Sequence, residues 1–541
     1  MVKISIPSSI REGPRTTNTI AKKRYLIIYF AIIILSAQPA IIWFWIFYQF
    51  FPRVNLLFFI LFPFVFFVGY FVLIFSSIIF SKLFLLVINV FHKPKEGIFN
   101  REKKDKDYCY WSLRAIIKKW PIWLIRQLNL PILEILALKI FGVKTNFSNS
   151  LSEGWIDCEF IELGKNIKIG QGSVIMSNII VKNKLIVKKI IIKDNIVIGA
   201  HCCIAPGTII ESNTILGANS MTILNQHIIA NSIYNGSPAK KIMENEPIRD
   251  KIMVENEIFD KLNETKCDDK FLKAESKDLS VPYQAYISSG MLIIGGSYVI
   301  PGLLFFLYFY GFLIPNLLTI PFSFKLLFNV KILIILFLTP IIFVSIYLLH
   351  LVFIVLLTRI FYKFADKRGP VNGIFDRDLS ETSKKLDYYH FGSFLMKYPI
   401  FSIIRSPFPW LINWELKFIG SNKVGKGTVI EESYLHSHIN FGKNCYYGTF
   451  AHISNHLVDG VYGKENLTFY GAQIGDNCAF NSLTGGMPGL EIGENSTFLL
   501  KATSIKYDKM GENGIYAGFP AKRLTKEEVK EIFGGEYNEE E

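Results

Sequence analysis

The chain carries nearly the same series of motifs twice, and this repetition limits the folds that are open to it. Residues 97–101 (GIFNR) return as residues 373–377 (GIFDR). The pairs KWPI and KYPI, LKIFG and LKFIG, and GSPAK and GFPAK follow in the same order at a nearly constant offset. Such spacing predicts two units of one kind joined head to tail. The two halves can therefore be compared, because a residue that chemistry needs in one half can be missing from the other.

Each half contains an apolar block that predicts a helical hairpin in a membrane. Residues 25–51, 55–91, 285–315 and 332–360 are almost uncharged, and each run exceeds the roughly 20 residues that cross a bilayer. Lysine and arginine flank these runs, and cationic flanks stay in the cytoplasm. The sequence therefore predicts an integral protein of the cell membrane with four spans and cytoplasmic soluble domains.

The net charge of +14 suits contact with anionic membrane lipids. Because the basic residues flank the spans instead of covering one folded face, the charge does not indicate a nucleic-acid partner. A basic, aromatic stretch follows each hairpin, at residues 111–141 and 388–418. Its composition predicts helices lying in the membrane interface, with aromatic side chains buried and cations such as Lys118 and Lys119 toward headgroups. Ordinary amphipathic helices packed on the soluble domain are the alternative.

The last stretch of each half is punctuated by an aliphatic residue followed by glycine. This pair occurs within residues 167–172, 198–200 and 215–218, and again within 424–427, 441–444, 474–477 and 492–495. Spacing at multiples of about six predicts the short coils of a parallel β-helix. The aliphatic side chain points inward, and the glycine is expected to take the backbone conformation that other residues resist at the corner.

These turns, with the closing motifs at residues 235–240 and 517–523, resemble the left-handed β-helix, or hexapeptide-repeat, acyltransferases. The resemblance covers about residues 147–242 and 420–524. The whole unit, hairpin included, resembles the membrane-bound C-terminal region of polylysine-synthetase-type nonribosomal peptide synthetases. The predicted fold is two tandem copies of a transmembrane hairpin, interfacial helices and an all-β left-handed parallel β-helix.

The predicted organisation has nine segments. They are a basic N-terminus (1–24), hairpin 1 (25–91), interfacial helices 1 (92–146), β-helix 1 (147–243), a charged linker (244–284), hairpin 2 (285–360), interfacial helices 2 (361–419), β-helix 2 (420–524) and a C-terminal acidic helix and tail (525–541).

The acyltransferase resemblance implies a catalytic histidine on a coil just before a loop, and His456 occupies that place. An imidazole of near-neutral pKa suits general-base chemistry on an incoming hydroxyl or amine. Asp459 is expected to orient the imidazole or position the acceptor, and Asn455 or a backbone N–H to stabilise the oxyanion. On the same landmarks the first half has Ile179 in place of His456 and Lys182 in place of Asp459. The first half is therefore expected to be structural or substrate-positioning.

The resemblance also implies a thioester co-substrate, either an acyl-CoA or a phosphopantetheine carrier, and no tightly bound cofactor. Gly518 and Ala521 of the closing motif are expected to contact this donor, and Lys522 and Arg523 its phosphates. Members of the family often trimerise with active sites between adjacent prisms. Either a homo-oligomer or pairing of the two β-helices within one chain is therefore expected.

The function indicated is a membrane-anchored acyltransferase that moves an acyl group to a hydroxyl or amine at the membrane surface. Aminoacyl or peptide-bond transfer is the alternative that the synthetase resemblance implies, and a non-catalytic membrane scaffold is another. A metal site is a further alternative, since His436 and His438 would lie on one face of a strand. No Cys or carboxylate at a recognisable spacing completes it, so no metal is expected. If the protein is an acyltransferase, a groove is expected from His456 to the region of Lys522, with Asp459 within hydrogen-bond reach of His456.

Overall fold

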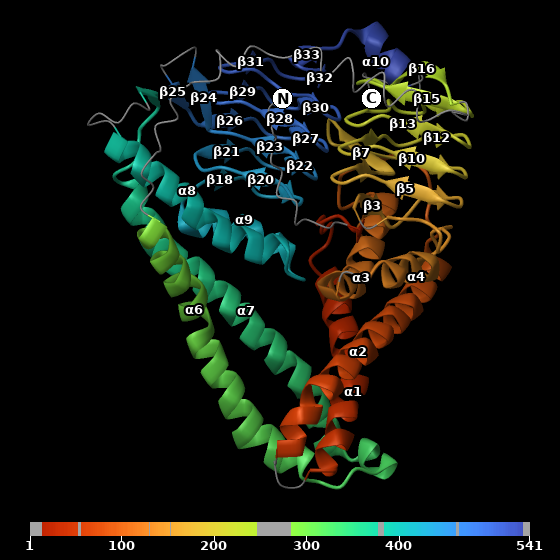
Figure 1. Cartoon of the computed structure of the whole chain (residues 1–541), viewed down its shortest axis with the longest axis vertical. Helices are drawn as coiled ribbons and strands as arrows, with labels where there is room; N and C mark the ends of the chain where they lie inside the picture. The colour runs from red at the N-terminus through yellow and green to blue at the C-terminus, as the bar shows by residue number, and fades with distance from the viewer. Residues whose placement is uncertain are drawn as a thin grey trace, which may run out of the picture.

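The computed structural model describes residues 13–51, 56–128, 130–151, 153–245, 283–376, 383–460 and 465–533. Two units of short stacked strands lie side by side, and long apolar helices extend away from them and converge at their far ends (Figure 1). The predicted charged linker and acidic tail lie mostly outside the described residues. Of the tail, the structure describes a helix, α10 (Lys526–Phe533).

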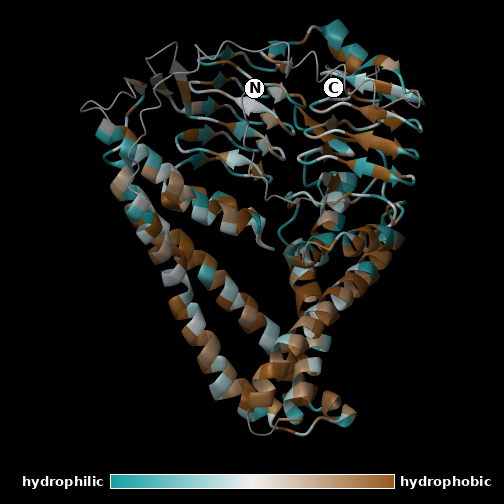
Figure 2. Ribbon diagram, in the orientation of Figure 1, coloured by the Kyte–Doolittle hydropathy of each residue, from teal (hydrophilic) through white to brown (hydrophobic). Residues whose placement is uncertain are grey.

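Within the described residues, four helices are long and apolar enough to cross a membrane, as the sequence predicts. They are α1 (Tyr25–Gln49), α2 (Leu56–Phe91), α6 (Tyr283–Tyr308), which η2 (Phe309–Leu318) continues, and α7 (Val330–Asp366). Figure 2 shows that most of their residues are hydrophobic. The two hairpins meet at their far ends, near η3 (Phe324–Phe328), where the Trp45 indole N–H donates to the Ile320 carbonyl oxygen at 2.8 Å.

The helices that follow each hairpin pack between the apolar helices and the strand units. They are α3 (Lys106–Leu128) and α4 (Pro131–Phe141) in the first half, and α8 (Ser383–Ile404), η4 (Pro409–Leu411) and α9 (Ile412–Ile419) in the second. The expectation that Lys118 and Lys119 face headgroups is wrong. Both are buried, and their ammonium groups donate at 3.0 Å to the carbonyl oxygens of Cys158 and Thr16. These carbonyls satisfy charges that apolar surroundings would penalise.

The strands of the first unit form coils stacked in three sheets, β1-β3-β6-β11, β14-β12-β9-β4 and β16-β15-β13-β10-β5. They pair in parallel, except that β16 pairs antiparallel with β15. The strands are β1 (Gly13–Arg15), β3 (Trp155–Asp157), β4 (Ile161–Leu163), β5 (Ile167–Ile169), β6 (Val174–Ile175), β9 (Ile190–Ile192), β10 (Ile196–Ile198), β11 (Cys203–Ile204), β12 (Ile209–Ile210), β13 (Ile215–Leu216), β14 (His227–Ile228), β15 (Ser232–Asn235) and β16 (Lys240–Glu244). Strand β1 comes from the N-terminal segment and pairs in parallel with β3.

The second unit repeats this arrangement in the sheets β18-β21-β26-β29-β31, β19-β22-β27-β30-β32-β33 and β20-β23-β28. Its strands are β18 (Lys423–Val424), β19 (Val429–Ile430), β20 (Tyr434–Leu435), β21 (Ile439–Phe441), β22 (Tyr446–Tyr447), β23 (His452–Ile453), β26 (Ala472–Ile474), β27 (Ala479–Phe480), β28 (Gly485–Gly486), β29 (Glu491–Ile492), β30 (Thr497–Phe498), β31 (Lys509–Met510), β32 (Ile515–Ala517) and β33 (Lys522–Arg523). The inward aliphatic residues stack into the core, as the repeat predicts.

The glycines of the aliphatic–glycine turns act differently from the prediction. A Cβ atom on Gly170 would lie 2.5 Å from the backbone nitrogen of Ala200 in the next coil, so the coils approach too closely for a side chain. The left-handed backbone conformation is taken instead by corner asparagines such as Asn195 and Asn213, both at φ 59°. Asparagine tolerates this region, and here the amides form a ladder, with Asn195 Nδ2 donating to Asn213 Oδ1 at 3.1 Å.

A hairpin leaves the coils at the same place in each half. It consists of β7 (Asn178–Val181) and β8 (Lys184–Val187) in the first half, and β24 (His456–Gly460) and β25 (Glu465–Phe469) in the second. The repeated GIF motif forms its third strand, β2 (Gly97–Asn100) or β17 (Gly373–Asp376), which pairs antiparallel with β8 or β25. The motif therefore recurs because it ties each hairpin to the segment that follows the apolar helices.

The two strand units pack against each other within the chain. The side-chain amide of Asn481 bridges the backbone of Ile180, accepting from its N–H at 3.0 Å and donating to its carbonyl oxygen at 2.9 Å. The Lys182 N–H donates to Thr497 Oγ1 at 2.9 Å. An apolar cluster fills the same boundary, with buried members Trp155, Val174, Met176, Ile179, Val181, Ile186, Cys203, Ala205, Leu224, Leu499, Leu500, Ile515, Val529 and Phe533. The expected pairing of the two units within one chain is thus present.

Candidate functional site

His456 is the first residue of β24, at the point where the hairpin leaves the coils of the second unit. Its Nδ1 atom lies 2.5 Å from the hydroxyl oxygen of Tyr389 and 3.1 Å from Oδ1 of Asn455. Tyr389 belongs to α8, and its ring packs edge-on against Phe469 of β25, with centroids 4.9 Å apart. The imidazole is therefore held between the coil and a helix that follows the apolar hairpin.

The hydrogen bonds around Asn455 determine which imidazole nitrogen carries the proton. Asn455 Nδ2 donates to the Ser437 carbonyl oxygen at 2.9 Å, so Oδ1 faces Tyr389 and His456. The Tyr389 hydroxyl donates its single proton to Oδ1 at 2.8 Å. Nδ1 of His456 therefore faces two oxygens that accept, and it must carry the imidazole proton. The lone pair is left on Nε2, which is the requirement for a general base.

Two further histidines lie beside His456. The ring of His436 is 4.9 Å from that of His456, measured between centroids. Burial and, to a smaller extent, the neighbouring His456, His452 and Lys397 together lower the pKa of His436 to about 3. Burial also lowers the pKa of His452. At neutral pH His436 and His452 are thus uncharged, and neither competes with His456 for a proton.

One ladder of paired residues leads from these histidines to the closing motif. His452 pairs with Gly485, and Gly485 pairs with Thr503. The Thr503 N–H donates to the Gly518 carbonyl oxygen at 3.0 Å, and the Ala521 N–H donates to the Thr503 carbonyl oxygen at 2.7 Å. With about 4.8 Å between neighbouring strands, the ladder spans roughly 14 Å from His452 to Gly518.

Gly485 lacks a side chain where the ladder needs space. A Cβ atom there would lie 2.8 Å from both Cε1 and Nε2 of His452 and 2.6 Å from Cγ2 of Thr503. The His452 ring can therefore lie across the neighbouring coil. The sequence does not indicate this role, because Gly485 falls outside the aliphatic–glycine pattern.

The structure places the predicted site residues in different surroundings. Asn455 is fully buried, and its donating side is used by Ser437, so it positions His456 and does not face an oxyanion. Asp459 lies three residues along β24, paired with Asn466, and its side chain is outside the part of the chain that the structure describes. Lys522 and Arg523 are exposed in β33, and Arg523 pairs with Tyr516 on a different sheet from the His452 ladder.

The strand register corrects the comparison of the two halves by one residue. Asn178 opposes Val187 at the start of β7, as His456 opposes Phe469 at the start of β24. The first half therefore has Asn178, and not Ile179, in the place of His456. Asn178 donates at 2.6 Å to Asp157, a carboxyl whose pKa burial raises to about 6. The absence of an imidazole at this place agrees with the expectation that the first half lacks a counterpart of His456.

The face that carries the ladder differs between the halves. In the first unit its positions hold Trp155, Val174 and Cys203, which are buried against the second unit. The matching positions of the second unit hold Tyr434, His452 and Gly485, by the pairing of β20, β23 and β28. The same face is thus an apolar contact in one unit and a polar, histidine-bearing surface in the other.

The positions of His436 and His438 do not support the alternative of a metal site formed by these two residues. His438 sits at a corner with φ 63°, and its Nε2 lies 3.3 Å from Asp366 Oδ1, while the His436 ring packs edge-on against His456. The two imidazoles therefore do not share a strand face. Across the described ranges, no group of three His, Cys, Asp or Glu side chains is placed to hold a metal ion.

Tyr389 is the site residue that the sequence analysis missed. The repeat contains a signal for it, because the KWPI and KYPI motifs align Tyr389 with Trp111 of the first half. The exchange of an indole for a phenol at a buried position accompanies the exchange of Asn178 for His456. Both changes add the groups that make the hydrogen-bonded chain.

No protein-family model matches this chain, and no curated protein does. Similar solved structures include an N-acyltransferase from Bacillus cereus, crystallised with a dTDP-amino sugar and coenzyme A, at 21% identity over 22% of this chain and 78% of that one, TM-score 0.16. A maltose O-acetyltransferase from Clostridium difficile is 16% identical over 21% and 76%, TM-score 0.17. A hexapeptide-repeat acetyltransferase from Vibrio cholerae is 16% identical over 24% and 90%, TM-score 0.19. The case for a function therefore depends on this chain's own side chains.

Proposed function

We propose that the second unit is a membrane-anchored acyltransferase with His456 as its general base. The observation that carries the proposal is the chain from His456 Nδ1–H through the Tyr389 hydroxyl to Asn455, which leaves the lone pair on Nε2. Such a chain holds an imidazole in one tautomer and one orientation, as a general base requires. The coils are proposed to be left-handed β-helices, and both units are proposed to lie in the cytoplasm.

The proposed reaction moves an acyl group from a thioester to a hydroxyl or amine. His456 Nε2 takes the acceptor proton as the acceptor oxygen or nitrogen bonds to the thioester carbonyl carbon. The tetrahedral intermediate then collapses, the carbon–sulfur bond breaks, and the imidazolium returns the proton to the leaving thiolate. The positive imidazolium is stabilised because Nδ1–H already donates to the Tyr389 oxygen.

The donor is proposed to be acyl-CoA or a phosphopantetheine carrier, lying along the ladder from His452 to the closing loop. Gly518 and Ala521 reach this ladder through their hydrogen bonds with Thr503. Lys522, exposed in β33 next to Ala521, is proposed to contact the donor phosphates, and Arg523 to contribute charge from the adjoining sheet. Asp459 is proposed to position the acceptor.

Thioester turnover by the full-length protein in detergent tests the proposal. Free thiol is measured with acetyl-CoA, a longer acyl-CoA and an aminoacyl-phosphopantetheine as donors, and with hydroxylamine as the acceptor. The rate without protein is subtracted, because hydroxylamine also cleaves thioesters by itself. We expect release from at least one donor, and a fall of about 10²- to 10⁴-fold in the His456→Gln variant. His227→Gln, an exposed histidine of the first unit, is the matched control and should behave like the unaltered protein.

The donor that reacts decides between the two kinds of transfer. Turnover of the aminoacyl thioester alone would favour aminoacyl transfer over acetyl transfer. No release above the rate without protein from any donor, or release that His456→Gln leaves unchanged, would refute the proposal and favour a non-catalytic scaffold.

A further inference from the structure

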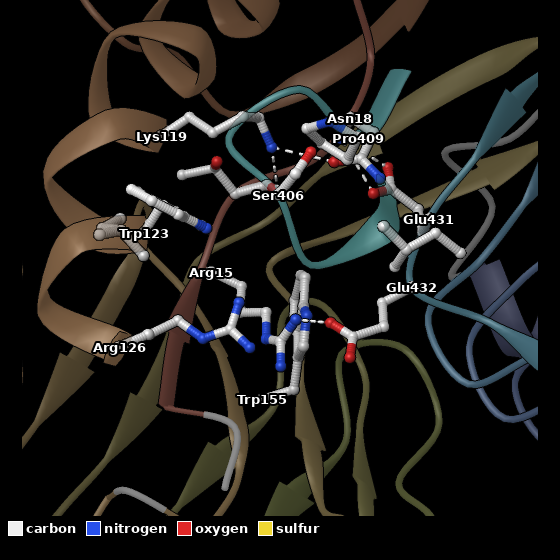
Figure 3. A pocket seen from close by; sticks show the side chains of 13 residues that line it. Arg15, Asn18, Lys119, Trp123, Arg126, Trp155, Ser406, Pro409, Glu431 and Glu432 are labelled. Carbon is white, nitrogen blue, oxygen red and sulfur yellow. Dashed lines mark hydrogen bonds and ion pairs between the residues drawn. The ribbon is translucent and has the colours of Figure 1, made fainter. Parts of the chain in front are cut away.

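A polar cavity lies at the junction of the two halves, away from His456. It has a volume of about 40 Å³ and is lined by the N-terminal segment, α3, the connection between α8 and η4, and the turn after β19. One ordered water needs about 10–15 Å³ by the same measure, so the space suits a group of several heavy atoms. Figure 3 shows this cavity with its lining side chains.

Cationic side chains reach the cavity from two of its walls. Arg15 comes from β1, and Lys119 and Arg126 come from α3. The side chains of Arg15 and Arg126 converge on the same space (Figure 3). Guanidinium groups that share a confined space favour an anion there, and a phosphate matches their planar fork.

Two carboxylates on the opposite wall balance part of this positive charge. Glu432 forms an ion pair with Arg15 and lies 3.5 Å from the guanidinium of Arg405. Glu431 accepts from the Asn18 N–H at 2.9 Å, and Lys119 donates to Asn18 Oδ1 at 3.0 Å. Burial lowers the pKa of Lys119 to about 8, while Glu431 acts in the opposite direction. An anion in the cavity would favour the charged form of Lys119.

The hydroxyl of Thr16 is a further donor in the wall. Its Oγ1 atom is buried and has no hydrogen-bond partner among the residues that the structure describes. A buried hydroxyl without a partner costs free energy, and a ligand that accepts its proton removes that cost. The cavity therefore combines cations with an unsatisfied donor, which favours an acceptor-rich anion.

The surroundings place the cavity at the polar end of the apolar helices. Next to its lining residue Pro409, the Pro407 carbonyl oxygen accepts from the Tyr29 hydroxyl of α1 at 2.7 Å. Tyr29 also packs edge-on against Trp410, with ring centroids 5.4 Å apart. Aromatic side chains of this kind mark the level of headgroups when the apolar helices cross a bilayer.

We propose that this cavity binds a phosphate group and so joins the two halves at the membrane surface. Arg15 and Arg126 contact the phosphate oxygens in a bidentate manner, Lys119 supplies a further charge, and Thr16 donates its hydroxyl proton. The two sources of such a group are a phospholipid headgroup and a soluble phosphate. The inference is independent of the proposed acyl transfer.

The experiment measures the thermal midpoint of the full-length protein in a phosphate-free detergent. Three probes are titrated: inorganic phosphate, a short-chain phosphatidylglycerol, and a diacylglycerol of the same chain length without phosphate. We expect a phosphate-bearing probe to raise the midpoint and the diacylglycerol to leave it unchanged. Arg126→Gln should weaken the apparent affinity by about tenfold or more, since it removes hydrogen bonds between charged partners.

The matched control is Arg101→Gln. Arg101 also joins the halves, through its contact with the Tyr446 ring, but it lies outside the cavity. A response to inorganic phosphate assigns a soluble source, and a response to the phospholipid alone assigns a headgroup. No response to either phosphate probe, or equal affinities in the unaltered protein and Arg126→Gln, would overturn the proposal.

Discussion

Replacing Tyr389 by phenylalanine removes one oxygen atom from the His456 site and keeps the packing. The ring of Tyr389 stays against Phe469 and His456, at centroid distances of 4.9 and 5.3 Å. The hydroxyl that lies 2.5 Å from His456 Nδ1 and 2.8 Å from Asn455 Oδ1 is lost. Asn455 Oδ1 remains 3.1 Å from Nδ1, so the proton stays on Nδ1 with one partner fewer.

The size of the effect follows from the charge on the imidazole. In the transition state His456 is becoming an imidazolium, and a hydrogen bond to a charged group contributes about 1.5–3 kcal/mol. Its loss corresponds to a roughly 10- to 150-fold fall in kcat. Tyr389 is only 6% exposed, so it is not expected to contact substrate and KM should not change. The effect should be smaller than that of His456→Gln, which removes the base itself.

The assay is steady-state thiol release with the donor that the unaltered protein uses. Tyr447→Phe is the matched control, because it also removes a buried tyrosine hydroxyl, one that donates to the Tyr434 carbonyl oxygen at 3.2 Å. A Tyr389→Phe enzyme within twofold of the unaltered kcat would refute the reasoning. So would a rise in KM at constant kcat, because it would mean that Tyr389 binds substrate.

Three further predictions concern the ladder, the boundary between the units and the buried histidine. Gly485→Ala should lower the thermal midpoint and raise KM for the donor severalfold, because its methyl group would lie 2.8 Å from the His452 ring; unchanged values of both would contradict the account of the ladder. Asn481→Ala should destabilise the protein by about 1–3 kcal/mol for each group of Ile180 left without a partner. A denaturation scan should show this loss, and Asn440→Ala, on an exposed amide pair, should change little; equal losses would count against a role at the boundary. The pKa of His436 falls from 6.5 to about 3 on folding, so as the pH drops below 6.5 the unfolded chain binds a proton that the folded chain does not. The thermal midpoint should therefore fall more steeply from pH 6.5 to 5 in the unaltered protein than in His436→Asn, whereas parallel curves would contradict the assignment.

Much of the fold could be predicted because apolar runs and short repeats in the sequence indicate the helices and the coils. Four apolar runs predict the four long helices, since length and composition alone decide whether a helix can span a bilayer. The aliphatic–glycine turns predict stacked coils, because each coil repeats one inward position. The predicted reason for glycine at these corners, its backbone conformation, was wrong at Gly170. Glycine is needed there because the next coil lies too close for a side chain, and the sequence of one coil does not show how closely the next coil stacks.

The placement of the candidate site residues was predicted in part. His456 is placed where a hairpin leaves the coils, as the motif indicates. The role of Asn455 was wrong, because hydrogen bonds to Ser437 and Tyr389, far away in the sequence, use both ends of its amide. The alignment of Ile179 with His456 was wrong by one residue. The KWPI and KYPI motifs, at the offset that aligns Trp111 with Tyr389, place Asn178 against His456, and the strand register agrees.

The sequence by itself determined which segments are apolar, which form coils and which half has an imidazole before the hairpin. These properties depend on residue type and on spacing within one turn or one coil. The tertiary structure alone decided the tautomer of His456 and the cavity that Arg15 shares with Glu432. His456 and Tyr389 are 67 residues apart, and the N-terminal segment reaches the second unit across more than 400 residues, with Thr17 and Glu431 separated by 414. Contacts over such separations are set by how helices pack on coils, and no local period in the chain records that packing.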